Sequence, residues 1–462
     1  MSKTKKLISN TLIFGLGTFG SKLLQYFLLP YYTALLTTSQ YGIIDNLQNI
    51  GTLCVPIVSL TIAESVFRYA MDKNNDKDEV YSIGLLMTLL GGLVFFILSL
   101  LFYLVYPSFY VWIVYLYVVA NMLRTLASQY VRAIGMVKLF SIDNIFMTLM
   151  ILVLNIFFLS FAKLGINGYM FAYILGNLLS FILLSVCAKL YKNISFKIKN
   201  KLLCKRMLQF SVPLIPNSMC WWISSCSNRF MITAMISASV NGLFAIASKI
   251  PTVMTLLINI FIQAWQMSAN EESDNKNIAT YYSDMFKYIS ALLGLASLAI
   301  ITLSKLIIIV IANVSYRDAW IYIPVLTLSV VFYSKAQFLG TVYTTFKKTS
   351  MAFYTNLFAA IINIVGNLIL IKLMGALGAA ISTTFSYLCF WIVRQINVKS
   401  LVDITIDVRK EIISTMVILL NVVNVMLGFG AMSYVISFVL IICSLLIYKN
   451  EIFSILKRLH IL

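Results

Sequence analysis

Charged residues are scarce in this sequence. Asp, Glu, Lys and Arg make up 11% of the 462 residues, whereas they make up about a quarter of a soluble globular protein. Apolar residues make up 61% of the chain, and the mean hydropathy is +0.92. A chain with so few charges and so many apolar residues is typical of an integral membrane protein rather than a soluble one.

Histidine is almost absent, which excludes several kinds of chemistry. The one histidine in the sequence is His460, in a basic tail. This leaves no histidine for a zinc site, a Ser-His triad or a histidine general base. The 7 cysteines have neither metal nor disulfide spacing, and no G-x-x-x-x-G-K-[ST] motif for ATP occurs. We therefore expect no enzyme activity, no metal and no cofactor.

Long apolar runs follow one another along the whole chain. A transmembrane helix needs about twenty apolar residues to cross a hydrocarbon core of about 30 Å. About fourteen such runs are predicted. They lie at 11–36, 41–65, 81–103, 109–131, 139–161, 166–188, 209–235, 239–266, 282–304, 319–343, 351–372, 376–398, 411–430 and 432–449. The predicted fold is therefore all-α, with helices that span a membrane.

Two turn sequences occur twice, which indicates an internal repeat. The turn at 39–42 recurs at 239–242, and the turn at 164–168 recurs at 374–378. We expect two pseudo-symmetric six-helix bundles plus two C-terminal helices. The predicted domains are a bundle at 1–188, a basic linker at 189–206, a bundle at 207–400, and two helices with a basic tail at 401–462. A transported molecule is expected between the bundles, near the midplane.

Lys and Arg are concentrated at the N-terminus and in every second connection. These connections hold Arg68, Lys73, Lys77, Arg132, Lys138, Lys347, Lys348, Arg409, Lys410 and the basic run at 189–206. By the positive-inside rule both termini are predicted to be cytoplasmic. The net charge of +19 is thereby assigned to the membrane surface and not to nucleic acid. No signal-peptide cleavage site follows the first run, so we expect that run to be retained.

Five cations lie well inside predicted spans. They are Lys22, Arg124, Arg229, Lys249 and Lys335. A cation at a helix centre costs about 2.5–3.5 kcal/mol on insertion scales, so five facing lipid would cost on the order of 15 kcal/mol. These side chains are therefore expected to face other helices or a water-filled cavity.

Acids that could neutralise these cations are expected to be few. Asp45 and Glu64 are the acids assigned to the spans, and Glu64 has Arg68 at i+4 as a structural partner. At least three cations are then left without an acidic partner, which favours a shared cationic cavity for an anionic group. The alternative is that each cation is neutralised separately by a buried acid.

Residues 15–20 match the dinucleotide pattern G-x-G-x-x-G. That pattern binds nucleotide only when it follows a strand and opens a helix of a βαβ unit. Here it lies inside an apolar run, one turn from Lys22. Close helix packing or a bend in the first helix is the better interpretation of these glycines.

Several motifs together resemble those of bacterial polysaccharide flippases. They are Gly20, Pro30, Tyr41-Gly42, Arg68-Tyr69, the run at 130–135, Ser211-Val212-Pro213-Leu214-Ile215-Pro216, Asn228-Arg229-Phe230 and the run from Gly242 to Pro251. Their order over nearly the whole chain is similar to that of the O-antigen (Wzx-type) transporters of the multidrug/oligosaccharidyl-lipid/polysaccharide (MOP) superfamily. This resemblance implies a MOP/MATE-like fold for the two bundles. One departure is Asn228, where the family usually has an acid before the arginine.

The resemblance implies a flippase for an undecaprenyl-pyrophosphate-linked oligosaccharide, such as a lipopolysaccharide O-antigen unit, in the bacterial inner (plasma) membrane. The five cations would bind the anionic pyrophosphate or acidic sugars. The partners it implies are the lipid bilayer, polysaccharide assembly proteins and an H⁺ or Na⁺ gradient. Asp45 and Glu64 are candidates for ion coupling by default.

Three other functions stay open at this point. A lipid II-type flippase has the same charge requirements with a different head group. A multidrug exporter of the same fold would need acids for cationic drugs, and these spans carry cations. A membrane polysaccharide polymerase or ligase would need a sizeable outward loop with catalytic residues, and the sequence has no polar stretch of that size.

Overall fold

The computed structural model describes residues 26–72, 74–192, 194–195, 200–271, 278–346 and 348–458. Within these ranges every regular element is a helix. In the same ranges 10 helices are long and apolar enough to cross a membrane, and the bent pair α3 and α4 makes up to 11. A shorter apolar helix, α17 (Ala431–Ile447), accompanies them. The predicted all-α, multi-pass membrane fold is therefore confirmed.

The chain divides into two compact units, Met1–Trp222 and Ile223–Leu462, and the division falls within α10 (Leu214–Met235). The described helices of the first unit are α2 (Leu29–Leu35), α3 (Thr38–Val58), α4 (Ile62–Met71), α5 (Lys77–Val105), α6 (Phe109–Ala133), α7 (Val137–Asn155) with the π-helix η1 (Ile156–Phe161), α8 (Gly165–Cys187), η2 (Leu190–Lys192) and α9 (Lys201–Ser211). Most of the predicted first span, including residues 15–20, lies outside the described residues.

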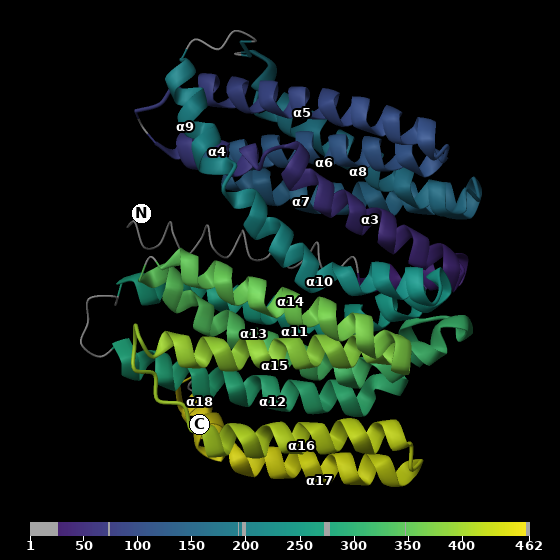
Figure 1. Cartoon of the computed structure of the whole chain (residues 1–462), viewed down its shortest axis with the longest axis vertical. Helices are drawn as coiled ribbons and strands as arrows, with labels where there is room; N and C mark the ends of the chain where they lie inside the picture. Colours follow the sequence, from purple (N-terminus) through teal and green to yellow (C-terminus); the bar gives the residue numbers. More distant parts are fainter. Residues whose placement is uncertain are drawn as a thin grey trace. The chain divides into compact units, whose positions relative to one another are not determined.

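The second unit continues from α10 to the C-terminal helices. Its elements are α11 (Ala238–Glu271), α12 (Ile278–Ile311), η3 (Val314–Tyr322), α13 (Ile323–Thr345), α14 (Thr349–Met374), α15 (Ala376–Val398), α16 (Val408–Leu427), α17 and α18 (Lys449–Arg458). α10 lies where the seventh span is predicted, although it is not among the ten helices that are long and apolar enough to cross a membrane. The helices α16 and α17 pack side by side as a hairpin (Figure 1).

Each unit is built around one central helix. In the first unit α6 contacts α3, α4, α5, α7 and α8. In the second unit α13 contacts α11, α12, α14, α15 and α16 (Figure 1). Because the central helix of each unit is surrounded by others, any charge on it must be satisfied by protein groups. Arg124 lies on α6 and Lys335 lies on α13.

The repeated turns have matching local structure, which explains why their sequences recur. Thr37 caps α3 by accepting a hydrogen bond from the Gln40 backbone N–H at 3.2 Å, and Ser237 accepts one from Val240 N at 3.3 Å at the start of α11. At the second turn, Gly165 has φ +54° and Gly375 has φ +63°. Only glycine adopts this left-handed backbone without strain.

The second span is broken, whereas the sequence predicted a continuous helix over 41–65. The axes of α3 and α4 differ by 54°, and the break contains Leu60 (φ 52°) and Thr61 (φ 48°), a conformation rare for residues with a side chain. The Thr61 hydroxyl donates to the carbonyl oxygen of Ser211 at 2.5 Å. Pro56 lies inside α3 just before the break, where its missing N–H weakens the helix.

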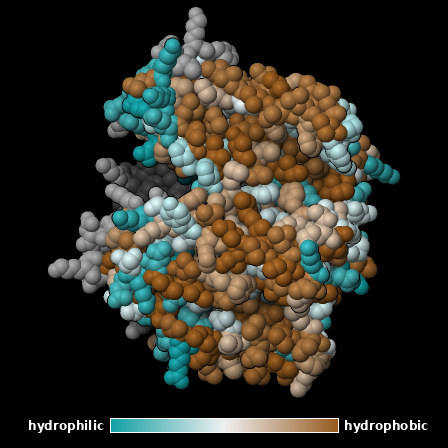
Figure 2. Space-filling view, viewed as in Figure 1, coloured by the Kyte–Doolittle hydropathy of each residue, from teal (hydrophilic) through white to brown (hydrophobic). Residues whose placement is uncertain are grey.

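The surface of both units has the pattern expected of helices in lipid. On the face shown in Figure 2, hydrophobic residues cover the sides of the helices, and hydrophilic residues gather near the helix ends. On α5, for example, Leu93, Ile97 and Leu101 are all exposed. A soluble protein would not leave such a stripe in water, so these side chains face the hydrocarbon.

Candidate functional site

Arg124, on the central helix of the first unit, is held by a network from two neighbouring helices. Its Nη2 donates to Asp143 Oδ2 at 3.1 Å and to Asn144 Oδ1 at 2.8 Å, both on α7. Its Nε donates to Ser180 Oγ on α8 at 2.9 Å. Asp143 is 0% exposed, and the Ser180 hydroxyl donates to its other oxygen. The pair therefore joins α6, α7 and α8 inside the unit.

Lys335, on the central helix of the second unit, also has an acidic partner. Its Nζ lies 2.5 Å from Glu411 Oε2 on α16, and the lysine side chain is 1% exposed. The ammonium also lies 4.9 Å from the centre of the Trp391 ring on α15. This ion pair ties the helix hairpin α16–α17 to the centre of the unit.

These two ion pairs correct the expected count of acids in the spans. The expectation that Asp45 and Glu64 are the acids within the spans was wrong, because Asp143 lies inside the predicted span 139–161 and Glu411 opens the span 411–430. Arg124 and Lys335 thus do not lack acidic partners. A search of each span for acids would have found both. Whether Arg124 and Lys335 contact a substrate stays a prediction.

Arg229 and Lys249 are brought to neighbouring positions in the second unit. Arg229 Nη2 on α10 donates to Ser248 Oγ on α11 at 2.6 Å, and Ser248 directly precedes Lys249. Both basic side chains are partly buried. No Asp or Glu occurs in the sequence between Asp143 and Glu271, so neither α10 nor α11 carries an acid before the last residue of α11. This helix pair has a local excess of positive charge.

Asn228, where the resembled family usually has an acid, belongs to a layer of amides and hydroxyls. Its Nδ2 donates to Thr383 Oγ1 at 3.4 Å, and its Oδ1 is buried without a hydrogen-bond partner among the described residues. Asn363 on α14 also donates to Thr383, at 3.3 Å, and accepts from Asn367 at 3.0 Å. This layer links α10, α14 and α15 through neutral groups, so it does not neutralise Arg229.

The remaining candidate residues are Asp45, Glu64 and Lys22, and the two that the structure describes differ in burial and in their contacts. Asp45 on α3 is 9% exposed and accepts from Asn49 Nδ2 at 3.1 Å. Glu64 is exposed on α4, and the expected ion pair with Arg68 is not found; Arg68 instead lies 4.9 Å above the Phe210 ring. Lys22 lies outside the described residues. No cluster of His, Cys, Asp or Glu that could hold a metal occurs in the described ranges.

Sequence reasoning missed one further buried cation, Arg394 on α15. It is 6% exposed and donates to the Ala336 carbonyl at 2.8 Å and to Thr355 Oγ1 at 3.2 Å. Its guanidinium also lies 4.1 Å above the Phe390 ring, and no described acid pairs with it. Arg394 lies near the end of the predicted span 376–398. Cations near span ends usually reach the membrane interface, so the sequence did not indicate that this one is buried.

The family of this chain follows from its sequence. The model of a family described as polysaccharide biosynthesis protein matches residues 7–266, more than half of the chain. The chain belongs to this family. The matched segment contains Lys22, Arg124, Arg229 and Lys249, whereas Lys335 lies beyond it. A search of the curated proteins gave no match.

Solved structures show the same fold at low sequence identity. This polysaccharide biosynthesis protein is similar to the lipid II flippase MurJ in an inward closed conformation, with 16% identity, a TM-score of 0.68, and coverage of 97% of this chain and 99% of that one. It is also similar to an inward-facing multidrug resistance MATE family transporter of the MOP superfamily, with 14% identity, a TM-score of 0.62, and coverage of 85% and 94%. A third similar structure is a mutant MATE transporter of Vibrio cholerae, with 14% identity, a TM-score of 0.52, and coverage of 86% of this chain and 97% of that one. The predicted MATE-like fold is confirmed.

Proposed function

We propose that this protein is a flippase that moves an undecaprenyl-pyrophosphate-linked oligosaccharide, the repeat unit of an O-antigen or similar surface polysaccharide, from the cytoplasmic to the outer leaflet. The observation that carries the proposal is membership of the polysaccharide biosynthesis family over residues 7–266. The flippase-like fold supports it, since MurJ covers 97% of the chain. The proposed mechanism is alternating access.

The anionic head group is proposed to contact Arg229 and Lys249, with Lys22 as a third candidate. A pyrophosphate crossing a membrane loses its hydration, and basic side chains offset that cost through charge-assisted hydrogen bonds. The helix pair α10–α11 suits this role because its basic groups lie on helices almost free of acids. We propose a holding role for Arg124 and Lys335, since each has a buried carboxylate partner.

The proposed location is the bacterial inner (plasma) membrane with both termini cytoplasmic, which the alternation of Lys and Arg along the connections supports. An H⁺ or Na⁺ gradient is proposed to supply the energy, with Asp45 as the candidate ion ligand because its carboxylate is buried within α3. Glu64 is a weaker candidate, since it is exposed on α4.

Deletion of the gene in its host tests the substrate. We expect surface polysaccharide to be lost and undecaprenyl-linked repeat units to accumulate facing the cytoplasm, as measured by lipid extraction and lectin access to intact cells. Restoration by the plasmid-borne gene is the control. Surface polysaccharide that persists after deletion would refute the proposal.

A lipid II flippase is the second candidate, favoured by the near-complete coverage of MurJ. Its deletion would stop peptidoglycan synthesis and leave lipid II on the cytoplasmic side, with surface polysaccharide precursors unchanged. The same extraction therefore separates the two substrates. Loss of drug efflux alone would instead indicate a multidrug exporter.

A further inference from the structure

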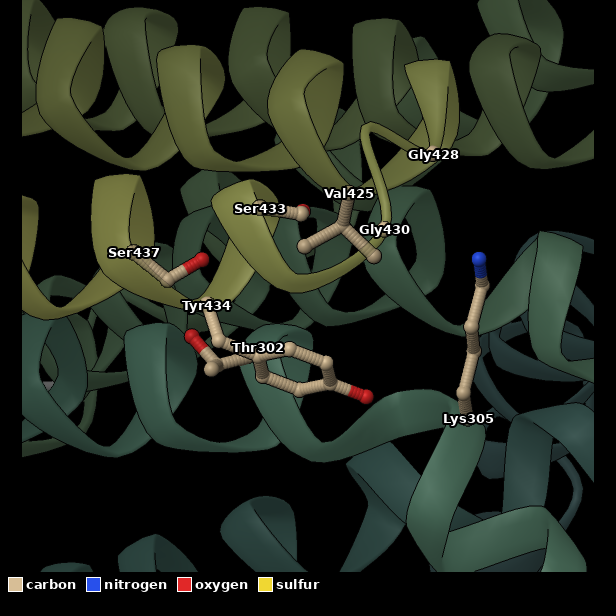
Figure 3. Close-up of a pocket in the computed structure, with 8 residues that line it drawn as sticks. All are labelled: Thr302, Lys305, Val425, Gly428, Gly430, Ser433, Tyr434 and Ser437. Atoms are coloured by element: carbon tan, nitrogen blue, oxygen red, sulfur yellow. The ribbon is translucent and has the colours of Figure 1, made fainter.

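A small cavity lies at one end of the second unit, between α12 and the hairpin α16–α17. It has a volume of about 20 Å³, which is room for one water-sized group, such as a single oxygen of a larger ligand. It is lined by Thr302, Lys305, Val425, Gly428, Gly430, Ser433, Tyr434 and Ser437 (Figure 3). It lies on the turn between α16 and α17, away from the cations discussed above.

Lys305 supplies the charge of this cavity. Its Nζ lies 4.1 Å from the centre of the Trp320 ring on η3 and 3.7 Å from where a Cβ would stand at Gly428. No ion pair involves Lys305 in the described part of the chain, and Asp318, the acid on the same η3 helix as Trp320, forms none with it. Among the described residues, no carboxylate therefore balances its positive charge.

The hydroxyl donors on the floor of the cavity are already used in hydrogen bonds within the protein. The Ser437 hydroxyl donates to Asn421 Oδ1 at 2.6 Å, and the Thr302 hydroxyl donates to the Leu298 carbonyl at 2.7 Å. Tyr434 differs, because its hydroxyl makes no hydrogen bond within the described residues and points toward the side where Lys305 stands (Figure 3). Lys305 and Tyr434 are thus the side chains that can donate to a ligand here.

An ammonium and a phenol hydroxyl that line one small cavity favour an anion, such as a phosphate, of which the cavity admits one oxygen.

The surroundings favour a lipid as the source of that phosphate. Leu427, Met432 and Val435, next to the cavity on α16 and α17, are 64%, 60% and 56% exposed and apolar, as expected of side chains that face acyl chains. Trp320 over the lysine is the residue type that concentrates at the head-group level. We propose that Lys305 and Tyr434 bind the phosphate of an acidic phospholipid head group, whose acyl chains lie along α17.

The site itself does not depend on the proposed function. Only the leaflet does: in the proposed orientation, the turn between α16 and α17 lies at the outer face. Lipid binding to the purified protein is measured without reference to orientation or transport, so failure of the lipid site and failure of the flippase proposal are distinguishable.

Native mass spectrometry of the full-length protein tests the proposal. The protein in detergent is titrated with phosphatidylglycerol or phosphatidylcholine, for the natural chain and for Lys305→Gln, Lys305→Arg and Tyr434→Phe. We expect Lys305→Gln to weaken phosphatidylglycerol binding about tenfold, as for the loss of one charge-assisted hydrogen bond. Lys305→Arg should retain most of the binding, and Tyr434→Phe should lose a smaller part.

Lys372→Gln is the matched control, since Lys372 is an exposed lysine in the last turn of α14 and lies far along the chain from this cavity. It should bind phosphatidylglycerol like the natural chain. Equal loss in Lys305→Gln and Lys372→Gln, or equal binding of phosphatidylcholine, would overturn the proposal. Displacement of phosphatidylglycerol by millimolar inorganic phosphate would assign the site to a free anion and refute the lipid.

Discussion

At the scale of single residues, the cations inside the predicted spans differ in their surroundings. Arg124 and Lys335 each lie on the central helix of a unit and each pair with a buried carboxylate. Arg229 and Lys249 lie on helices whose sequences are almost free of acids. A cation that pairs with a buried carboxylate holds helices together, and helices with few acids favour the approach of an anion. This difference decides which substitutions should affect folding and which should affect transport.

Arg124→Ala should destabilise the first unit strongly. Removing the guanidinium leaves Asp143 as a buried charge without its partner, and breaking a buried ion pair on one side costs about 3–5 kcal/mol. We expect a clear fall in the midpoint of thermal unfolding in detergent and a lower protein level in the membrane.

The double variant Arg124→Leu/Asp143→Leu is the control for this prediction. It removes both charges together, so it should recover much of the lost stability. If Arg124→Ala unfolds at the same temperature as the natural chain but transports poorly, then Arg124 acts on the substrate and not on the fold.

Lys249→Ala and Arg229→Ala should lower transport without lowering the protein level. Each removes a basic group proposed to contact the head group, and a hydrogen bond to a charged group contributes about 1.5–3 kcal/mol, or roughly tenfold or more in affinity. The measurement is surface polysaccharide in a complemented deletion strain, with membrane protein quantified in parallel. Lys399→Ala, at an exposed site just past α15, is the control. Normal export in both variants would exclude them from the site.

At the scale of elements, the break in the second predicted span is stabilised by hydrogen bonds to another helix. α3 ends at Val58, the chain passes through Leu60 and Thr61 with positive φ, and α4 begins at Ile62. The Thr61 hydroxyl and the Ser65 hydroxyl donate to backbone carbonyls of α9, at 2.5 Å and 2.9 Å. The amphipathic α9, within and beyond the predicted basic linker, thus supports the break and is not a free connection.

Two adjacent glycines of α5 should respond differently to the same substitution. A Cβ at Gly91 would fall on the carbonyl oxygen of Val58, where α3 ends, whereas a Cβ at Gly92 would meet Val119 Cγ2 at 3.8 Å. Gly91→Ala must push a backbone away, so we expect a loss of a few kcal/mol, about 1–3 for overpacking. Gly92→Ala should be neutral.

Thermal unfolding of both glycine variants in detergent is the measurement. The two positions share a helix and a residue type, so the comparison isolates the contact with Val58. Equal midpoints for the two variants would show that α5 does not approach α3 as closely as the structure has it.

At the scale of the whole molecule, the distribution of charge relates the fold to the membrane. The net charge of +19 is carried mainly by the termini and alternate connections, and the spans themselves have few charges. Such a distribution predicts one orientation in the bilayer. The orientation matters for the function, because it decides from which leaflet a lipid-linked substrate would be taken.

The predicted orientation is checked with reporter fusions. A green fluorescent protein fused after Leu462 should be fluorescent, because it folds in the cytoplasm, and alkaline phosphatase fused there should be inactive. Alkaline phosphatase inserted at the turn after Gly428 should be active. The opposite pattern would reverse the proposed topology and move the Lys305 site to the inner leaflet.

The sequence alone determined the class of fold, because hydrophobicity and helix length are local properties. Apolar runs predicted the spans, and repeated turns such as those before α8 and α15 predicted the doubled architecture. The motifs in order predicted the family. The sequence also determined that four cations, Arg124, Arg229, Lys249 and Lys335, need polar surroundings, since a cation in an apolar run is costly wherever it points.

Only the tertiary structure decided which partner satisfies each cation. Arg124 meets Asp143 from the next helix, whereas Lys335 meets Glu411 from a helix 76 residues further along the chain. The break at Leu60 and Thr61 likewise depends on hydrogen bonds to α9, which is distant in sequence. Pairings of this kind depend on how helices pack and not on the residues within one helix. For that reason hydropathy predicts the helices of this protein but not the contacts that neutralise their charges.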